Sequence, residues 1–475
     1  MNYICWGTII NIFNRSYLYR SICASVVFTA LSGCAVAPQP ILNSLTPENW
    51  RNTQLPLSPQ ASDLKQWWHA FNDPKLNELV DKALQNNLDV AEAVERLRAI
   101  RVLSKKAQSP YLPSLSINTR DSVSPDTRTS YFLIGFDSIW ELPLFGAKQS
   151  ADRLAKGNHA LFEAQLRTVQ VTLVAEVSRR WIELRTAQQT EQTLAAIRDI
   201  HRDKLNLMQV RETLALEPRA TVAMARAELA HAEMALTGPR QQINRSAQQL
   251  AILTGQTQPD PLWLTPGAPP KLGQWQLGSL PADLLRTRPE ISSAEALVIV
   301  AAGELGISEA DIYPHISLGA SLQWSLNVAS NRRHTPNGNS IFSFGPGISI
   351  PLFDWGIRVA NAKAKNHQMR AAVFAYRKSI LEGIAETEIA MGNLEQLRIS
   401  EQSSRQAYTC AQTRVDGQQL QTDLGFLSKL DLSSAQLDKL RAQQQLDQIS
   451  AERNIAYVSL YKALGGAPLP MKEAD

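Results

Sequence analysis

The residues of this chain that could do acid–base, nucleophilic or metal chemistry do not form a recognisable catalytic pattern. Its 475 residues include seven histidines and four cysteines, but no H-E-x-x-H, no His pair at ligand spacing and no Cys-x-x-Cys that would hold a zinc ion. There is no G-x-S-x-G for a hydrolase nucleophile and no G-x-x-x-x-G-K-[ST] for a phosphate loop. The sequence therefore predicts a protein that is not an enzyme and uses no metal or cofactor.

Cys34 is the cysteine with a predicted chemical role. An apolar run over residues 22–30 follows two arginines and ends at Leu31-Ser32-Gly33-Cys34, which resembles a bacterial lipoprotein signal. The resemblance implies cleavage before Cys34 and acylation of its thiol and new amino group. Cys34 is followed by Ala35 and not by Asp. By resemblance to sorted lipoproteins, this implies transport to the outer membrane and not retention in the inner one. An ordinary secretory peptide or a short membrane helix is the alternative, but the run is too short to span a bilayer.

The remaining cysteines predict no disulfide. Cys5 and Cys23 would leave with the signal, so Cys410 has no intramolecular partner in an oxidising compartment. Its place in a helical pattern predicts a packed small hydrophobe and not a nucleophile.

A strict alternation of apolar and polar residues along 316–326 predicts a lipid-facing β-strand. Residues 114–118, 132–144 and 342–352 alternate in the same way. In the second of these segments Asp137 and Glu141 lie on the face opposite the aromatic residues, so we expect them to face a water-filled lumen. The four strands form two hairpins, residues 113–145 and 314–353, whose polar connections from Arg120 to Ser130 and from Asn327 to Ser340 are expected to be external loops.

Four strands cannot close a membrane barrel, because the smallest such barrels have about eight. Open strand edges are excluded from hydrocarbon. The sequence therefore predicts that identical copies complete the barrel. A soluble β-sandwich is the alternative, and the aromatic residues on the outward face argue against it.

The long helices predicted beside the strands occur twice. A proline-free run from Ala147 to about Leu214 has apolar residues at three-and-four spacing, and a second helix leads to Leu253. The pattern returns from Ala360 to about Leu424 and from Phe426 to Leu464. Each long helix and its return are expected to pair antiparallel. Their polar faces fit a solvated coiled coil and a hydrated tunnel equally well.

Matching motifs indicate that the mature chain is a duplicated unit. By subtraction, the first helices and the strand-opening prolines Pro113 and Pro314 are offset by 201, the Pro-Leu-Phe motifs at Pro143 and Pro351 by 208, and Leu253 and Leu464 by 211. We therefore expect a signal (1–33), a proline-rich strap (34–63), a first repeat (64–255), a crossing (256–278), a second repeat (279–466) and a tail (467–475).

Composition narrows the function. The chain is 44% hydrophobic and 19% charged, and with no apolar run of helix-spanning length it is not expected to be an α-helical membrane bundle. A net charge of only +4 argues against nucleic-acid binding.

Several motifs resemble one family. They are Trp67-Trp68 with Phe71-Asn72-Asp73-Pro74, the segments 136–146 and 280–291, and the C-terminal run 461–466. They resemble outer-membrane efflux proteins, in the lipoprotein branch serving resistance-nodulation-division pumps of Gram-negative bacteria. The resemblance implies a homotrimer in outer-membrane lipid, in which a twelve-stranded membrane β-barrel continues into a periplasmic tunnel of long α-helical coiled coils. It also implies a periplasmic adaptor, or membrane fusion protein, and an inner-membrane pump as partners.

The resemblance also implies a gate at the far turn of the helices. Residues 424–436 resemble the family's gate segment, with Gly425 at the turn and Asp431 at an acidic gate position; Asp423 is the reserve candidate. Ser434 stands where the family often has a further Asp, which implies a weaker gate. The alternative is that Asp431 is a solvated helix-start carboxylate.

Two functions remain open. The first is passive conduction of small molecules delivered by a pump, since the chain has no motif that would supply energy. The second is a structural or tethering coiled-coil lipoprotein that conducts nothing.

Overall fold

The computed structural model is divided into two compact units. It describes residues 42, 51, 57–58, 66–122, 131–272, 277–278, 288–327 and 340–466. We call residues 99–161 with 295–375 the sheet unit, and residues 44–98, 162–294 and 376–475 the helical unit. The predicted lipidation residue Cys34 lies outside the described residues.

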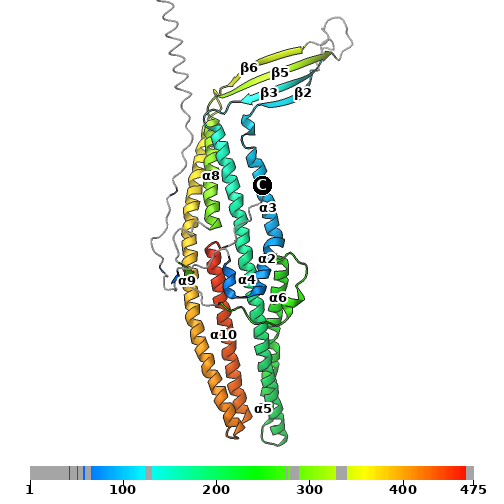
Figure 1. Cartoon of the computed structure of the whole chain (residues 1–475), viewed down its shortest axis with the longest axis vertical. Helices are drawn as coiled ribbons and strands as arrows, with labels where there is room; N and C mark the ends of the chain where they lie inside the picture. Colours follow the sequence, from blue (N-terminus) through cyan, green and yellow to red (C-terminus); the bar gives the residue numbers. More distant parts are fainter. Residues whose placement is uncertain are drawn as a thin grey trace, which may run out of the picture. The chain divides into compact units, whose positions relative to one another are not determined.

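The sheet unit contains one antiparallel sheet in the order β2-β3-β5-β6 (Figure 1). Its strands are β2 (Ser114–Ser122), β3 (Tyr131–Glu141), β5 (His315–Asn327) and β6 (Ser340–Ser349). Phe136 lies opposite Ile117 and Leu322, whereas Asp137 lies opposite Ser116 and Ser321. Because facing residues share a side of the sheet, the predicted apolar and polar faces are both formed. β2 and β6 are the edge strands.

A tight helix contact supports this sheet. α8 (Pro289–Ala310) packs against the start of α4 (Ala147–Thr213) through glycines. A Cβ added at Gly303 would lie 2.7 Å from the Leu154 nitrogen, and one at Gly306 would lie 2.2 Å from Ser150 Oγ. Only glycine permits so close an approach.

α8 corrects one expectation from the sequence. Among the described residues it is long and apolar enough to cross a membrane by length and composition, so the prediction that no such run exists was wrong. Small apolar residues that pack closely on another helix pass the same test, and one such helix is weak evidence for a span.

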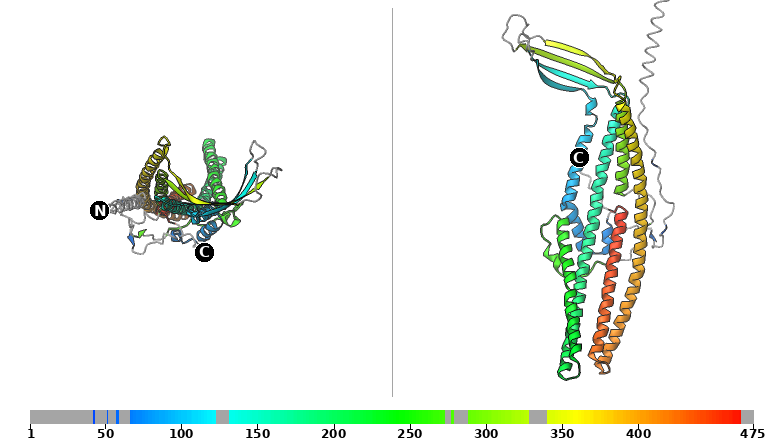
Figure 2. Two further views of the ribbon diagram at one scale, coloured as in Figure 1. Left: turned by 90° about the horizontal axis from the view of Figure 1, so that it is seen from above. Right: turned by 180° about the vertical axis from the view of Figure 1, so that it is seen from behind.

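The helical unit is built on two antiparallel pairs (Figures 1 and 2). α4 pairs with α5 (Arg219–Ala235), where Lys204 Nζ lies 2.7 Å from Glu228 Oε2. α9 (Ile357–Asp423) pairs with α10 (Lys429–Ala463), where Arg414 Nη1 lies 3.2 Å from Asp438 Oδ2. The predicted pairing is therefore present. The shorter elements are η1 (Trp67–Phe71), α2 (Pro74–Asn86), α3 (Leu88–Lys105), η2 (Ser109–Tyr111), α6 (Thr237–Leu253), α7 (Pro261–Leu264), β1 (Leu57–Ser58) and β4 (Leu277–Gly278).

An aromatic cluster forms the core of the helical unit. Trp67 stacks on Tyr461 at 5.5 Å between ring centroids, and its Nε1 donates to the Gly466 carbonyl at 3.1 Å. Asp73 caps α2 and also accepts a 2.7 Å hydrogen bond from Trp181 Nε1. The Trp-Trp and Asp-Pro motifs are therefore structural.

The two repeats have the same backbone at fixed offsets. α3 and α8 begin 201 residues apart, as do β2 and β5. After the hairpins the offset becomes 210, for α4 and α9, both 67 residues long, and for the positive-φ residues at 145 and 355, 215 and 425, and 255 and 465. The second hairpin region is thus nine residues longer. The sequence offset of 211 was wrong by one, because Gly255 corresponds to Gly465.

Two local expectations also change. The return helix of the first repeat is broken between α5 and α6, because Pro239 has no N–H and its ring clashes with the carbonyl four residues earlier, at Ala235, where α5 ends. Cys410 is exposed on α9. The prediction that it is a packed small hydrophobe was therefore wrong.

Candidate functional site

The polar face of the sheet is the first candidate conduction surface. Asp137 is half-buried at its centre and accepts a 2.9 Å hydrogen bond from Asn118 Nδ2. Gln323 Nε2 lies 3.5 Å from the other carboxylate oxygen. Ser321 and Ser343 share a further hydrogen bond of 3.1 Å between their hydroxyls. These hydrogen bonds place the Asp137 carboxylate among amide and hydroxyl side chains on the polar side of the sheet.

Glu141 lies on the same face, at the end of β3. Its Oε1 is 2.8 Å from His315 Nδ1, at the start of β5; Glu141 is exposed and His315 is half-buried. The sequence pattern predicted the orientation of Glu141 but not this partner, because His315 precedes the alternating run and the two residues are 174 positions apart.

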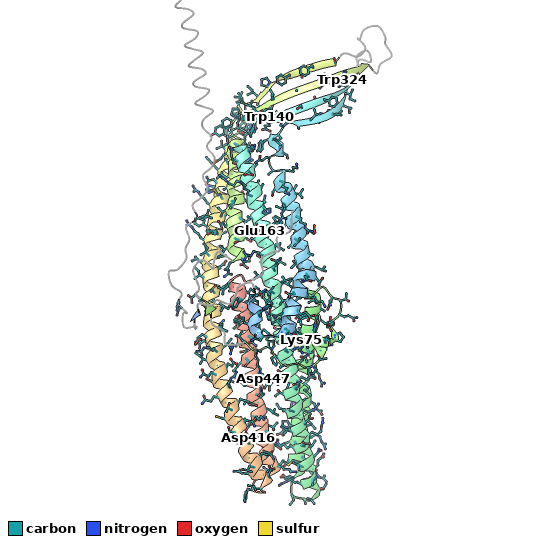
Figure 3. The ribbon with its side chains drawn as sticks, viewed as in Figure 1. Lys75, Trp140, Glu163, Trp324, Asp416 and Asp447 are labelled. Carbon is teal, nitrogen blue, oxygen red and sulfur yellow. The ribbon has the colours of Figure 1, made fainter. Side chains whose placement is uncertain are left out.

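The other face is apolar and carries aromatic residues near both ends. Figure 3 shows Trp140 and Trp324 toward opposite ends of the sheet. Trp140 Nε1 donates to the Tyr111 carbonyl at 3.1 Å, and Trp324 makes an edge contact with Phe136 at 6.0 Å. Phe342, Phe344 and Ile348 on β6 are all more than 60% exposed. Aromatic residues at both margins of an exposed apolar band are typical of transmembrane β-barrels.

The turn between α9 and α10 holds the predicted gate residues. Gly425 has φ +80°, and the next residue, Phe426, donates its N–H to the Gln421 carbonyl at 2.8 Å. These features form a glycine C-cap. Asp423 accepts a 2.8 Å hydrogen bond from Gln419 Nε2 and is exposed.

Asp431 lies in the first turn of α10. Its N–H donates to Ser428 Oγ at 3.2 Å, and the Ser428 hydroxyl donates to Asp431 Oδ2 at 2.6 Å. Ser428 is thus the N-cap of α10, and Asp431 lies in its first turn, which fits the interpretation of Asp431 as a helix-start carboxylate. The carboxylate is nevertheless exposed, so its role in a gate stays a prediction.

Sequence reasoning missed a buried charge cluster on α9 and α10. Glu401, 10% exposed, pairs with Arg453 and accepts hydrogen bonds from Arg405 at 3.0 Å and Ser450 at 3.1 Å. Although burial raises the pKa of Glu401, the hydrogen bonds and charge of Arg453, with Arg405 and Ser450, hold it below its ordinary value. The carboxylate therefore stays ionised. The i, i+4 spacing of Glu401 and Arg405 was visible in the sequence, but Arg453 lies 52 positions away.

A cavity of about 560 Å³ adjoins this cluster. Asp447 lines it, and burial raises the pKa of this carboxyl above its ordinary value, while a hydrogen bond from Gln443 lowers it. Asn454 Nδ2 donates to the Pro270 carbonyl at 2.9 Å, which attaches the segment between the repeats to α10.

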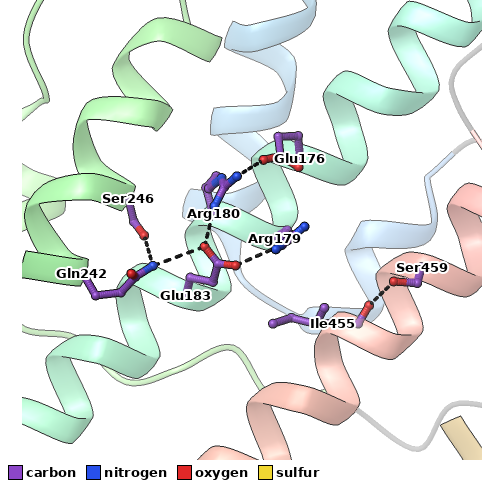
Figure 4. Close-up of polar contacts among 8 residues, drawn as sticks. All are labelled: Glu176, Arg179, Arg180, Glu183, Gln242, Ser246, Ile455 and Ser459. Atoms are coloured by element: carbon purple, nitrogen blue, oxygen red, sulfur yellow. Dashed lines mark hydrogen bonds and ion pairs between the residues drawn. The ribbon is translucent and has the colours of Figure 1, made fainter. Parts of the chain in front are cut away.

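A second polar network joins α4 to α6 (Figure 4). Glu183 accepts hydrogen bonds of 2.9 Å from both Arg179 and Arg180, and Gln242 Nε2 lies 3.4 Å from it. Arg180 also pairs with Glu176. These contacts fix the first repeat's broken return helix against the long helix.

Comparison with known proteins agrees with this geometry. The chain matches the family model described as outer membrane efflux protein over residues 79–256 and 280–466. It is 31% identical over 421 residues to the solvent efflux pump outer membrane protein SrpC of Pseudomonas putida, covering 83% of this chain and 86% of that protein. It is 27% identical over 454 residues to the pyoverdine export outer membrane protein OpmQ of Pseudomonas aeruginosa, covering 92% and 94%.

Solved structures share the fold. The outer-membrane channel OprN aligns with a TM-score of 0.79 at 25% identity, covering 92% of this chain and all of that one. The Campylobacter jejuni CmeC outer membrane channel aligns with a TM-score of 0.78 at 18% identity, covering 93% and 96%. The predicted fold class, long helices with four antiparallel strands per chain, is confirmed.

Proposed function

Because this chain belongs to the outer membrane efflux protein family, and is thus an outer-membrane channel component of an efflux pump rather than an enzyme, we propose that three copies form one continuous conduit. The observation that carries the proposal is the four-stranded sheet, in which Phe136 faces Ile117 and Leu322 on one side while Asp137 faces Ser116 and Ser321 on the other. Such a sheet fits lipid on one side and water on the other.

The edge strands give the reason for assembly. β2 and β6 each have one side without a partner strand in the described chain. Lipid cannot satisfy those backbone groups, so a spanning sheet must close. Three copies of four strands make a twelve-stranded barrel, within the range of known outer-membrane barrels.

Conduction by this assembly is passive. The bore is lined by Asp137, Glu141 and the serines of the polar face, and the sequence has no phosphate-loop motif through which the channel itself could use a nucleotide. A periplasmic adaptor and an inner-membrane resistance-nodulation-division pump supply the substrate. The names of SrpC and OpmQ refer to solvents and pyoverdine, and we extend to this chain only their common class, small organic molecules.

We further propose that Cys34 carries the lipid anchor, in the periplasmic leaflet of the outer membrane. The support is the sequence Leu-Ser-Gly-Cys at residues 31–34 after an apolar run. The barrel spans the membrane by itself, so Cys34→Ser should remove the acyl mass of the mature subunit while leaving its conductance unchanged.

The gate is proposed at the turn between α9 and α10. Asp423 and Asp431 place exposed carboxylates on both sides of Gly425, and three copies around an axis would make a negative constriction that favours cations.

The test is conductance of the purified full-length protein in planar bilayers. Wild type should conduct with cation preference, and Asp431→Asn should lower that preference and weaken block by multivalent cations added on the periplasmic side. If only Asp423→Asn has these effects, the constriction belongs to the turn itself. A stable trimer that never conducts would favour the tethering alternative.

A further inference from the structure

A cavity of about 640 Å³ lies in the sheet unit, where the barrel strands give way to helices. Phe145, four residues after β3 ends, forms part of its wall together with Ile312, Tyr313 and Val359. The rings of Phe145 and Tyr313 are stacked at 4.6 Å. Lys363, His367 and Arg370 of α9 also line it, with Glu309 as the acidic residue of the lining. The cavity thus combines aromatic and cationic groups.

The first part of α9 has an excess of positive charge. Residues 357–381 contain six Lys or Arg and no Asp or Glu. Lys365 pairs with Glu304 at 2.8 Å, and Arg358 donates to the Asp311 carbonyl at 2.7 Å. Among the described residues, neither Lys363 nor Arg370 has an ion-pair partner. These two cations are therefore not neutralised by any described residue of the chain.

The corresponding part of the first repeat differs. Residues 147–171, at the offset of 210, contain four Lys or Arg and two acids, Asp152 and Glu163. The positive excess is therefore a feature of α9 and not of every helix that follows a strand.

A second copy of the chain would not supply the missing negative charge. If β6 of one copy pairs with β2 of the next, α9, which follows β6, comes beside α3, which leads to β2. Residues 99–111, at the end of α3 and beyond it, contain Arg101, Lys105 and Lys106 and no acid. The neighbouring copy would add like charge, which raises the need for an anion at this position.

We propose that this cavity binds the phosphate of an anionic glycerophospholipid from the periplasmic leaflet. Lys363 and Arg370 hold the phosphate, since Arg and Lys form charge-assisted hydrogen bonds to phosphate oxygens and basic pockets beside membrane spans take lipid head groups. The Phe145 and Tyr313 rings lie against the glycerol and first acyl carbons, as aromatic residues do at membrane interfaces. The bound lipid would then lie between α9 of one subunit and α3 of the next. This inference rests on the proposed trimer.

The test is native mass spectrometry of the full-length protein in detergent with added dioleoylphosphatidylglycerol. The variant Lys363→Gln/Arg370→Gln removes both cavity cations. The matched control Lys378→Gln/Lys429→Gln removes two exposed lysines outside the cavity. Wild type and control should retain up to three lipids per trimer, and the cavity variant should bind at least tenfold more weakly. Dioleoylphosphatidylcholine should bind each protein weakly.

Three outcomes would overturn the proposal. The first is equal retention of phosphatidylglycerol by the cavity variant, and the second is equal retention of phosphatidylcholine by wild type. The third is displacement of the lipid by millimolar inorganic phosphate, which would assign the site to a free anion. The same spectra report the oligomeric state. Absence of a trimer would contradict the proposed assembly. The lipid bound to each oligomeric species still tests the lipid site separately.

Discussion

The first repeat holds its helix pair with an exposed ion pair, whereas the second buries one at the same position. Glu191 and Glu401 are equivalent at the offset of 210. Glu191 is 31% exposed and lies 2.7 Å from Arg240, which is 59% exposed. Glu401 is 10% exposed and contacts Arg453, Arg405 and Ser450. The same residue type on the same backbone thus has two different environments.

The difference arises from the partner helix. Ser450 takes the position of Arg240, and Arg453 takes the position of Ile243, a residue packed on the core. Moving the cation by one turn brings it under the segment that crosses between the repeats, near Pro270. Duplication therefore conserved the backbone, while the environment of each side chain determines what an ion pair contributes to stability.

The largest expected effect is at Glu401. Glu401→Ala leaves Arg453, which is only 19% exposed, without its partner, and this should lower the free energy of unfolding by about 3 to 5 kcal/mol per subunit. Glu191→Ala is the matched control and should cost less than about 1 kcal/mol, because that pair is solvated. Urea unfolding of the detergent-solubilised proteins measures both. Equal losses would show that the two environments do not differ energetically.

The pH dependence provides a second check on the same pair. Since the folded-state pKa of Glu401 is lowered, its stabilisation is present above the ordinary carboxyl pKa and is lost as the pH falls through the folded value. The stability difference between wild type and Glu401→Gln should therefore be full at neutral pH and shrink only in acid.

The return helices give the next comparison. Proline at residue 239 breaks the first return helix, and the equivalent residue in the unbroken α10 is Ile449. Ile449→Pro should cost about 3 kcal/mol by removing a helical hydrogen bond and introducing a clash. Ile449→Ala separates the loss of the side chain from the backbone effect. Pro239→Ala should change stability by less than about 1 kcal/mol, because Gly238 keeps helix propensity low there. Thermal unfolding followed by circular dichroism would measure how differently the two return helices respond to these substitutions.

The sequence was sufficient where local periodicity decides the structure. Alternation around Asp137 predicted which strand residues share a face, and the helical patterns that end at Leu424 and restart at Phe426 predicted the reversal between them. It was insufficient where distant residues meet. Nothing local connects Glu401 with Arg453, or Glu141 with His315. The exposure of Cys410 could not be predicted either, because a helical pattern alone does not say which face a neighbouring helix covers. The repeat offset was read from short motifs. A two-residue insertion between Pro351 and Trp355 gave the Pro-Leu-Phe motifs an offset of 208, whereas the backbone equivalence of Phe145 and Trp355 gives 210.

The smallest effect is expected at the two turns, where the repeats place different residues, alanine and glycine, at equivalent positions. Ala215 and Gly425 both have positive φ, 52° and 80°, both are exposed, and no atom lies within 4 Å of a Cβ added at Gly425. The left-handed conformation strains alanine but not glycine, so Gly425→Ala should destabilise the turn by about 1 kcal/mol. Ala215→Gly should stabilise its turn by a similar amount, because the same residues are exchanged in the same geometry. Hydrogen exchange of the amides flanking each turn measures both changes locally. If Gly425→Ala changed conductance without changing exchange, the glycine would be needed for movement of the gate and not for the resting shape of the turn.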